Sequence, residues 1–276
     1  MNRTTMHGLA WCLLLLFLMA CEAPDENGAV DDDAVAETPE ATTDCELVMG
    51  WDPWEPYQYR TPTGEVAGLD VELVSAAAEK AGCELEYHQA DFVSLLAALR
   101  DGEIDFIPGA TRTAAREEFA YFSIPYRDET FAIWVRAEDL DLYQDESLES
   151  LLQQRRRVGL TEGFLYGDEA EAVIANPDYE RYLTSARIGD INLLRLLEHD
   201  IDALIEDPFV AASVQRRLGL EDQVARLEQE LSSGEVTLMF SRESVDQSLV
   251  ERFDEALQAL IEGNVRDEIT TRYQTQ

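Results

Sequence analysis

Arg116 is the side chain whose sequence context most clearly indicates a binding site. It ends the segment GATRTAAR (109–116), which follows directly after a strand-like run, and Thr113 in that segment can cap the helix that comes next. A strand end, a hydroxyl group, free helix N–H groups and an arginine together suit a carboxylate, because a guanidinium binds both carboxylate oxygens at once. The alternative from this local pattern is an ordinary ion pair between Arg116 and a surface acid.

Asp207 is the candidate partner for a cationic ligand group. It follows the run ALIE (203–206), and the next residue is Pro208, which is typical of the first turn of a helix. The Asp207 carboxylate would therefore lie at the carboxyl end of a strand, where a ligand's cationic group could reach it. Aspartate is also a good helix N-cap, and the two roles can coexist.

Two further loops follow strand-like runs. The loop WDPWEPY (51–57) contains aromatic and proline residues, which either pack structurally or wall a pocket. The loop GFLYG (163–167) opens a helix, and its backbone N–H groups would favour an anion. Both loops belong to the ends of predicted strands, where α/β proteins place their ligand sites.

Other chemistries lack their motifs. The three histidines are scattered and no HExxH, CxxC or similar cluster occurs, so we expect no metal. No GxSxG, Walker A or GxGxxG motif occurs either, so we expect no cofactor. Pairs of acids carry no information, because 57 of the 276 residues are acidic.

The net charge of −36, from 57 acidic and 21 basic residues, excludes a general nucleic-acid binder and a peripheral binder of anionic lipid. Nine acids lie in 22–44, whereas 45–276 hold 48 acids and 20 bases. A solvated surface explains the excess, and so does a high-salt habitat, where salt screens the repulsion. The single lysine favours the high-salt interpretation, which predicts that folding weakens when salt is removed.

The N-terminal residues are typical of an export signal. An apolar run of twelve residues, LAWCLLLLFLMA (9–20), is shorter than the roughly 20 residues of a spanning helix. It ends in LMAC (18–21), which resembles a bacterial lipobox, so we expect lipid on Cys21; ordinary signal cleavage is the alternative. Residues 22–44 then form an acidic, flexible tether. A periplasmic or cell-surface protein anchored to a membrane is predicted.

Two cysteines remain for the folded body, Cys45 and Cys83. Each starts a strand-like run, and in a parallel sheet with one helix between the strands both starts lie at the same edge. In an oxidising compartment this arrangement favours a disulfide, and two buried thiols are the alternative.

The body alternates short apolar runs with segments of helical period, which predicts an α/β fold on parallel sheets. We expect strands at 45–49, 83–87, 104–107, 130–136, 157–161, 202–205 and 236–240. We expect helices at 70–81, 92–100, 113–119, 168–175, 192–199, 209–218, 247–261 and 265–273. The order of these elements indicates two similar halves with a ligand crevice between them.

Six motifs in order resemble the type II periplasmic solute-binding proteins, in particular the polar amino-acid-binding family of ABC importers. The resemblance covers 45–276 and rests on VMGWDPWEPY, GEVAGLDVELVSAAAEKAG, SLLAALRDGEIDFIPGATRTAAREEFAYFSIPY, RRVGLTEG, LLRLLEHDIDALIEDPFVAAS and LIEGNVRDEITTRY. It implies two lobes joined by two hinge strands, each lobe a parallel-dominated sheet flanked by helices. Lobe 1 would comprise 45–129 and 239–276, and lobe 2 would comprise 130–238.

The resemblance also implies roles for individual residues. Arg116 would hold the ligand carboxylate, Gly109 and Thr111 would add backbone and hydroxyl contacts, and Asp207 would take the ammonium. Trp54 stands at the position of a stacking aromatic.

Phe92 stands where the family has an apolar wall. The family's second-lobe loop usually reads Gly-Thr-Thr or Gly-Thr-Ser, and its hydroxyl and N–H groups also meet the carboxylate. Here the loop keeps Gly163, but the hydroxyl is missing unless Tyr166 replaces it.

The expected function is therefore capture of a small carboxylate ligand, above all an amino acid, by a monomer that closes its lobes and delivers the ligand to an ABC permease. No catalysis is expected. A stand-alone ligand sensor is one alternative. A dehydratase that acts on cyclic amino-acid precursors, as some relatives of this fold do, is the other.

Overall fold

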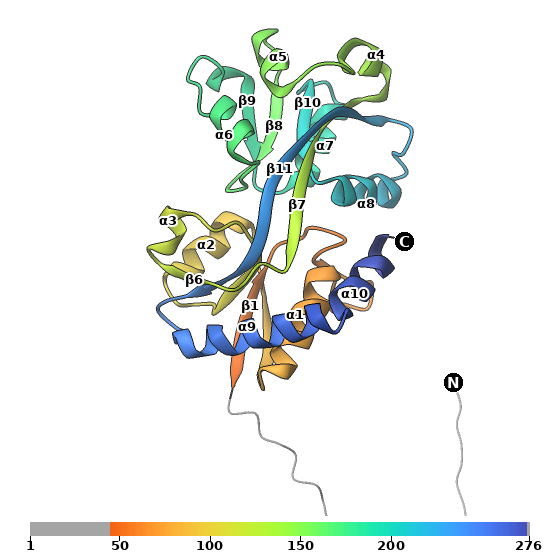
Figure 1. Ribbon diagram of the computed structural model, residues 1–276. Helices are drawn as coiled ribbons and strands as arrows, with labels where there is room; N and C mark the ends of the chain where they lie inside the picture. Colours follow the sequence, from red (N-terminus) through yellow and green to blue (C-terminus); the bar gives the residue numbers. More distant parts are fainter. Residues whose placement is uncertain (1–44, 275–276) are drawn as a thin grey trace, which may run out of the picture. The chain divides into compact units, whose positions relative to one another are not determined.

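The computed structural model describes residues 45–274 (Figure 1). The expected signal segment 1–21 with Cys21, and the expected tether 22–44, lie outside the described residues. Within 45–274 no helix is both long enough and apolar enough to cross a membrane.

Two long antiparallel strands, β7 (Arg127–Arg136) and β11 (Val224–Ser241), run from one half of the molecule into the other (Figure 1). They sit at the centre of the strand order β4-β1-β5-β11-β7-β10-β8-β9. On one side β1 (Glu46–Trp51) pairs in parallel with β4 (Glu84–Gln89) and β5 (Phe106–Ala110). On the other side β8 (Val158–Thr161) pairs in parallel with β9 (Leu183–Ala186) and β10 (Ala203–Glu206).

We call the half that contains β1, β4 and β5 lobe 1, and the half that contains β8, β9 and β10 lobe 2. Lobe 1 carries α1 (Leu69–Lys80), α2 (Phe92–Arg100), α3 (Ala114–Glu117), α9 (Gln247–Glu262) and α10 (Val265–Gln274). Lobe 2 carries α4 (Leu140–Tyr143), α5 (Leu148–Gln153), α6 (Asp168–Ile174), α7 (Gly189–Leu197) and α8 (Pro208–Leu218). The predicted two-lobe α/β fold is confirmed, while the predicted boundaries at 129/130 and 238/239 stay predictions.

Three short strands and two 3₁₀ turns complete the described chain. β2 (Tyr59–Arg60) and β3 (Val66–Ala67) pair only with each other, and β6 (Ala120–Phe122) pairs with β11. The 3₁₀ turns are η1 (Ala137–Asp139) and η2 (Glu180–Tyr182), both in lobe 2.

Local sequence signals account for most of these elements. The predicted apolar face of α1 is buried: Leu69, Leu73, Val74, Ala77 and Ala78. Asp91 caps α2 by accepting the Ser94 N–H at 3.1 Å, and Thr113 caps α3 by accepting the Arg116 N–H at 3.2 Å.

The hinge strand β11 is much longer than the predicted strand 236–240. Its first twelve residues include three glutamates and two serines, and only Val224, Leu227 and Leu231 among them are buried, so no apolar run marks this part. Pairing with β7, and not a continuous apolar run, therefore holds this segment extended. The short strand β9 lacks an apolar signal for the same reason, since only its last residue is buried.

A buried ion pair fixes the start of the other hinge strand. Arg127, the first residue of β7, donates from Nε to Oδ1 of Asp70 at 3.0 Å and from Nη2 to Oδ2 at 3.1 Å. Asp70 is fully buried in the first turn of α1. Burial acts to lower the pKa of Arg127, but Asp70 and other nearby acidic groups together outweigh it, and the pKa lies well above its ordinary value. The pair thus ties β7 to lobe 1 in charged form.

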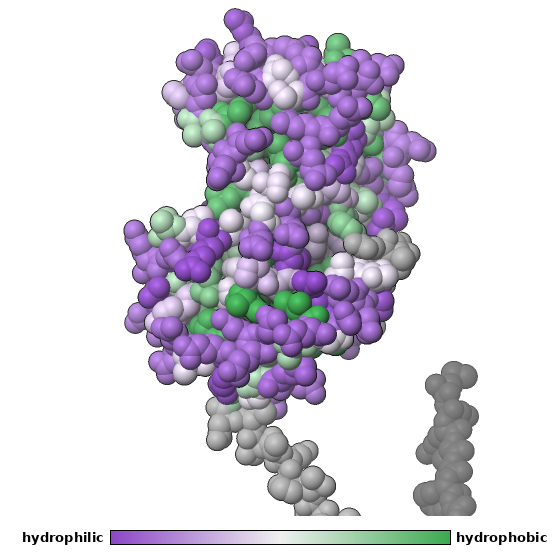
Figure 2. Space-filling model, in the orientation of Figure 1, coloured by the Kyte–Doolittle hydropathy of each residue, from purple (hydrophilic) through white to green (hydrophobic). Residues whose placement is uncertain are grey.

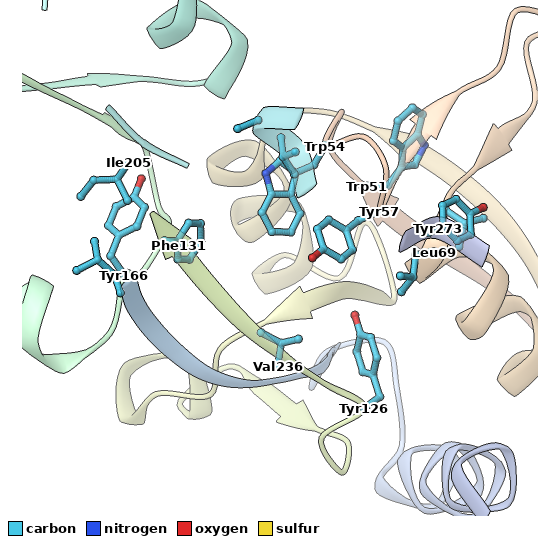
Figure 3. Packing of buried hydrophobic residues seen from close by; sticks show 14 of the residues in the cluster. Trp51, Trp54, Tyr57, Leu69, Tyr126, Phe131, Tyr166, Ile205, Val236 and Tyr273 are labelled. Atoms are coloured by element: carbon cyan, nitrogen blue, oxygen red, sulfur yellow. The ribbon is translucent and has the colours of Figure 1, made fainter. Parts of the chain in front are cut away.

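Aromatic side chains from both lobes pack where the hinge strands pass (Figure 3). Trp54 and Tyr57 of lobe 1 stack with ring centroids 4.7 Å apart. Phe131 of β7 meets the edge of Tyr166, from lobe 2, at 4.9 Å. One hydrophobic core therefore continues from lobe 1 through the hinge into lobe 2.

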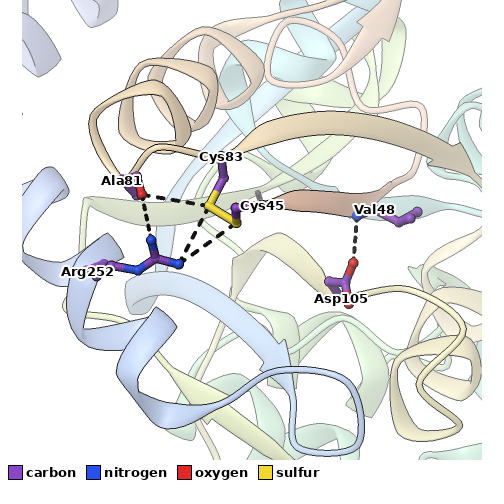
Figure 4. The surroundings of a disulfide bond; sticks show 6 residues. All are labelled: Cys45, Val48, Ala81, Cys83, Asp105 and Arg252. Atoms are coloured by element: carbon purple, nitrogen blue, oxygen red, sulfur yellow. Dashed lines mark hydrogen bonds between the residues drawn. A yellow bond between two sulfur atoms is a disulfide. The ribbon is translucent and has the colours of Figure 1, made fainter. Parts of the chain in front are cut away.

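Cys45 and Cys83 form a disulfide at the outer edge of lobe 1 (Figure 4). The two residues directly precede the paired strands β1 and β4, as the parallel-sheet argument anticipated. Arg252 of α9 donates to the carbonyl of Ala81 at 3.1 Å and lies beside both sulfur atoms, so the bridge also contacts the C-terminal helices.

Replacing both cysteines with serine is expected to lower the free energy of unfolding by about 4 kcal/mol, because the bridge constrains a loop of 38 residues in the unfolded chain. Urea unfolding of the oxidised protein and of the double variant measures the difference. The reduced wild-type protein is the control and is expected to match the variant. Equal midpoints for the oxidised protein and the variant would contradict this role.

Candidate binding site

A cavity of about 30 Å³ lies between the lobes, and the surface is hollowed on the same side of the molecule (Figure 2). One ordered water needs about 10–15 Å³ of such volume, so the cavity has room for about two or three waters. Its lining comes from both lobes and from β7: Asp52, Trp54, Gln58, Phe92, Pro108, Gly109, Thr111, Arg116, Glu129, Phe131, Gly163, Phe164 and Leu165.

Six of the eight predicted ligand-binding residues line this cavity. Five belong to lobe 1, including Arg116 of α3, and one belongs to lobe 2: Trp54, Phe92, Gly109, Thr111, Arg116 and Gly163. Residues that are far apart in the sequence are thus brought together, while the roles assigned to each stay predictions.

Tyr166 and Asp207 do not line the cavity. The Tyr166 hydroxyl accepts the backbone N–H of Thr161 at 2.6 Å, so it does not replace the hydroxyl that the second-lobe loop lacks. Asp207 caps α8, because its Oδ1 accepts the N–H groups of Phe209 and Val210 at 2.7 and 3.1 Å. The capping role of Asp207 is therefore realised, and its Oδ2 accepts the Tyr57 hydroxyl at 3.1 Å.

Arg116 is held between the lobes without a carboxylate. The residue is 8% exposed, and its Nη1 donates to the Thr111 carbonyl and its Nη2 to the Gly163 carbonyl, both at 2.9 Å. Within 45–274 it forms no ion pair, whereas the comparably buried Arg127 and Arg136 do. Burial lowers the pKa of Arg116 below its ordinary value. An anion that reaches this buried guanidinium would form an ion pair with it and offset the cost of burying its charge.

Acceptors gather on the same cavity. Burial raises the pKa of Asp52 and of Glu129 to about 7, although Arg127 and a hydrogen bond from Ser233 partly offset the effect at Glu129. Gln58 is 2% exposed, and its Oε1 has no hydrogen-bond partner within the described chain. These oxygens suit a ligand group that donates hydrogen bonds and carries positive charge.

Lobe 1 donors meet two consecutive acids at the end of β10. Trp54 donates from Nε1 to Oε1 of Glu206 at 3.1 Å, next to the bond from Tyr57 to Asp207. Burial raises the pKa of Glu206 to about 8, with the Trp54 bond acting in the opposite direction. The lobes are therefore in contact through hydrogen bonds as well as through packing.

Ion pairs also cross between the lobes at the rim of the contact. Arg187 of lobe 2 binds Asp91 at the start of α2 at 3.1 Å, and Arg217 of α8 lies 3.4 Å from Glu55. Both arginines are about half exposed, so each pair contributes little.

Several residues that line the cavity had no role predicted from the sequence. Asp52 lies in the loop WDPWEPY, and Phe164 and Leu165 lie in the loop GFLYG, so their loops were identified but not their contacts. Nothing in the sequence distinguishes Glu129 as a site residue, because it is one of 57 acidic residues. Phe131 is an apolar strand residue, a type that usually marks a core.

The described residues contain no group of three or more His, Cys, Asp or Glu side chains arranged to hold a metal ion. The cavity is a small pocket whose lining includes one cationic group and several acceptor groups.

The family "Bacterial extracellular solute-binding proteins, family 3" matches residues 47–276. A "Probable histidine-binding protein" of Campylobacter jejuni is 24% identical over 263 residues, which is 94% of either chain. A "Cyclohexadienyl dehydratase" of Pseudomonas aeruginosa is 34% identical over 74 residues, covering 26% of this chain and 28% of the enzyme.

A solved structure described as an ancestral arginine-binding protein bound to arginine aligns with a TM-score of 0.72. The sequence identity is 23%, and the alignment covers 84% of this chain and 99% of the other. At this identity the likeness shows the fold, which is the two-lobe arrangement described above.

Glu206→Gln is expected to flatten the pH dependence of stability. The carboxyl pKa is about 8 in the folded protein and near its ordinary value of 4.5 in the unfolded chain. Stability from this group is therefore complete below pH 4.5 and is lost as the pH rises through 8. Urea unfolding at several pH values between 4.5 and 8.5 should show a smaller loss for the variant than for wild type. Superimposable pH profiles would contradict the burial of this proton.

Proposed function

The chain belongs to the bacterial extracellular solute-binding proteins of family 3, and we propose that it binds an amino acid, or a related small carboxylate, between its two lobes. The relative named above as a histidine-binding protein supports an amino-acid ligand. Binding of an amino-acid solute, and not a reaction, is the activity that this family membership supports.

The observation that carries the proposal is the unpaired guanidinium of Arg116. In a chain whose body holds 48 acids, a buried arginine that lacks a carboxylate is unusual, and Arg116 borders the cavity. A ligand carboxylate that replaced the carbonyl of Gly163 at Nη2 would change a neutral acceptor for a charged one. Charge-assisted hydrogen bonds of this kind are about twice as strong as neutral ones.

The acceptor groups would determine the orientation of the bound ligand. Asp52, Glu129 and the unpartnered Oε1 of Gln58 line the same cavity as Arg116. A zwitterion satisfies both sets, with its carboxylate at Arg116 and its ammonium among the acceptors. Asp207, which the family resemblance suggested for the ammonium, is already engaged with α8 and Tyr57.

Hinge motion gives the ligand access. The cavity is covered on both sides, so the lobes separate about β7 and β11 before a ligand enters and close around it afterwards. Closure excludes water and strengthens the contacts to Arg116 and the acids. We propose that the closed, loaded form delivers its ligand to an ABC permease, as the family's importers do.

The proposed place of action is the periplasm or the cell surface, which the family's description supports. Attachment to the membrane through lipid on Cys21 is part of the proposal and rests on the LMAC sequence at 18–21. A monomeric protein is proposed as well.

A dehydratase is the second candidate, and one observation favours it. Asp52 and Glu129 have pKa values of about 7 beside the cavity, which is the range of a group that gives and takes protons at neutral pH. The short similarity to cyclohexadienyl dehydratase points in the same direction. Release of water from prephenate or arogenate by the purified protein would replace the binding proposal with this one. The stand-alone sensor stays an alternative for the partner, and not for the ligand.

Arg116→Ala is expected to weaken ligand binding by about 2–4 kcal/mol, which is the usual cost of removing one side of a charge-assisted pair. The ligand is first chosen by a thermal-shift screen of the common amino acids and small carboxylates, and its affinity is then measured by calorimetry. Arg112→Ala is the matched control, because Arg112 is 62% exposed, pairs with Glu117 and lies outside the cavity lining. Equal affinities for wild type and Arg116→Ala would refute the assignment.

Ligand binding is expected to release protons near neutral pH. A cationic group beside Asp52 and Glu129 lowers their pKa values from about 7, so affinity rises between pH 6 and pH 8. Calorimetry at pH 7 in buffers of different ionisation enthalpy counts the released protons. Glu129→Gln should release fewer than wild type, and proton uptake by wild type would contradict the placement of the cation.

A further inference from the structure

Phe164 stands in the aromatic part of the proposed ligand site. Its ring meets Trp54 edge-on at 5.5 Å and Phe92 edge-on at 5.6 Å, and lies 6.3 Å from Phe131. Trp54 and Phe92 belong to lobe 1, whereas Phe164 belongs to the second-lobe loop. A side chain of lobe 2 therefore fills the space between two aromatic walls of lobe 1. We call this space, bounded by Trp54, Phe92 and Phe131, the aromatic compartment.

The loop that carries Phe164 is anchored on both sides. Gly163 has φ 82°, and a Cβ on it would lie 3.2 Å from the Phe92 ring and 3.3 Å from Val93. Gly167 has φ 88°, and a Cβ on it would run into the backbone oxygen of Ser232 in β11. Glycine is thus required at both positions, for conformation and for space.

Tyr166 locks the loop further. It is 2% exposed, its hydroxyl is bonded to the backbone of Thr161, and its ring packs on Phe131. Phe164 therefore moves with lobe 2 as a unit, and returns to the aromatic compartment whenever the lobes close. The hydrogen bond from Arg116 to the Gly163 carbonyl joins the two lobes in the same closed position.

The remaining cavity is small because of Phe164. About 30 Å³ is enough for about two or three waters, which is well short of a long side chain. Arg116 and the acceptor groups border this remaining space. The compartment next to it, where a ligand's side chain would extend, is occupied.

We propose that Phe164 is the specificity-determining residue of this site and restricts the ligand to an amino acid whose side chain is no larger than a methyl or hydroxymethyl group. The inference rests on the proposed function and names the ligand class within it. It sets this chain apart from its relatives named for histidine and arginine. A long side chain meets Phe164 before the lobes can close, and closure is what completes the contacts to Arg116.

Phe164→Ala tests the inference by emptying the aromatic compartment. Calorimetric titrations of wild type and variant with glycine, alanine and arginine are compared. Wild type should bind glycine or alanine more tightly than arginine. The variant should bind arginine at least about tenfold more tightly than wild type does, because the side chain then enters the vacated space. Phe164→Leu should lie between the two.

Phe119→Ala is the matched control. Phe119 is a partly buried phenylalanine of lobe 1 that packs against Arg100 at 4.4 Å and lies outside the cavity lining. It should leave all three affinities unchanged.

Benzene binding tests whether Phe164→Ala is folded and has an empty aromatic compartment. Apolar cavities of this kind bind benzene, so benzene should raise the melting temperature of Phe164→Ala and not that of wild type or Phe119→Ala.

The outcomes separate the two levels of the proposal. Arginine binding that is equal or weaker in Phe164→Ala, with glycine or alanine still bound by wild type, overturns the role of Phe164 and leaves the amino-acid function intact. Binding of none of the three by wild type and none by the variant, together with benzene stabilisation of the variant, overturns the amino-acid function and this inference with it. Absence of benzene stabilisation in a folded variant overturns the compartment itself.

Discussion

The hydrogen bond from Arg116 to the Gly163 carbonyl is the contact on which the site depends. A guanidinium of lobe 1 is buried by a loop of lobe 2, and only neutral oxygens meet it. Burying a charge without an opposite charge is costly, and the closed lobes bear that cost here because packing and other hydrogen bonds across the same contact offset it. Among residues 45–274 the arrangement leaves this cation without a carboxylate partner, and it is the group to which the proposed ligand carboxylate would bind.

Burial without an opposite charge is also costly for the carboxyl groups between the lobes. Glu206 is buried beside Trp54, Glu129 is buried beside the cavity and Asp52 is partly buried there, so burial raises the pKa of each carboxyl group to about 7 or 8. Asp70, by contrast, has a bidentate arginine partner. The interior between the lobes therefore holds more carboxyl groups than cations. This excess is local and built into the fold, unlike the acidity of the outer surface, which reflects solvation.

Sequence reasoning located the elements well where burial and period coincide. α2 has the predicted bounds, and the buried face of α1 contains the five residues that its spacing indicated. The method failed on β11 and β9, where strand pairing and not an apolar run keeps the chain extended. It also identified the loops of the site better than their side chains. Phe164 was part of a quoted loop, yet nothing in the order of residues shows that its ring would reach Trp54 and Phe92.

By itself the sequence determined the α/β class, the two halves and the segment that carries Arg116, because these depend on period, composition and neighbours along the chain; it favoured the cysteine pair, which the structure then showed. Only the tertiary structure decided which groups share the cavity. Asp52 and Glu129 were two acids among 57 until the fold placed them around the same cavity as Arg116. Asp207 and Tyr166 stood at the right strand ends, but their hydroxyl and carboxylate oxygens bind the protein's own backbone. The reason is physical: a side chain's type is set by the sequence, whereas its partner is whichever group, of its own lobe or of the other, the fold brings within about 3 Å.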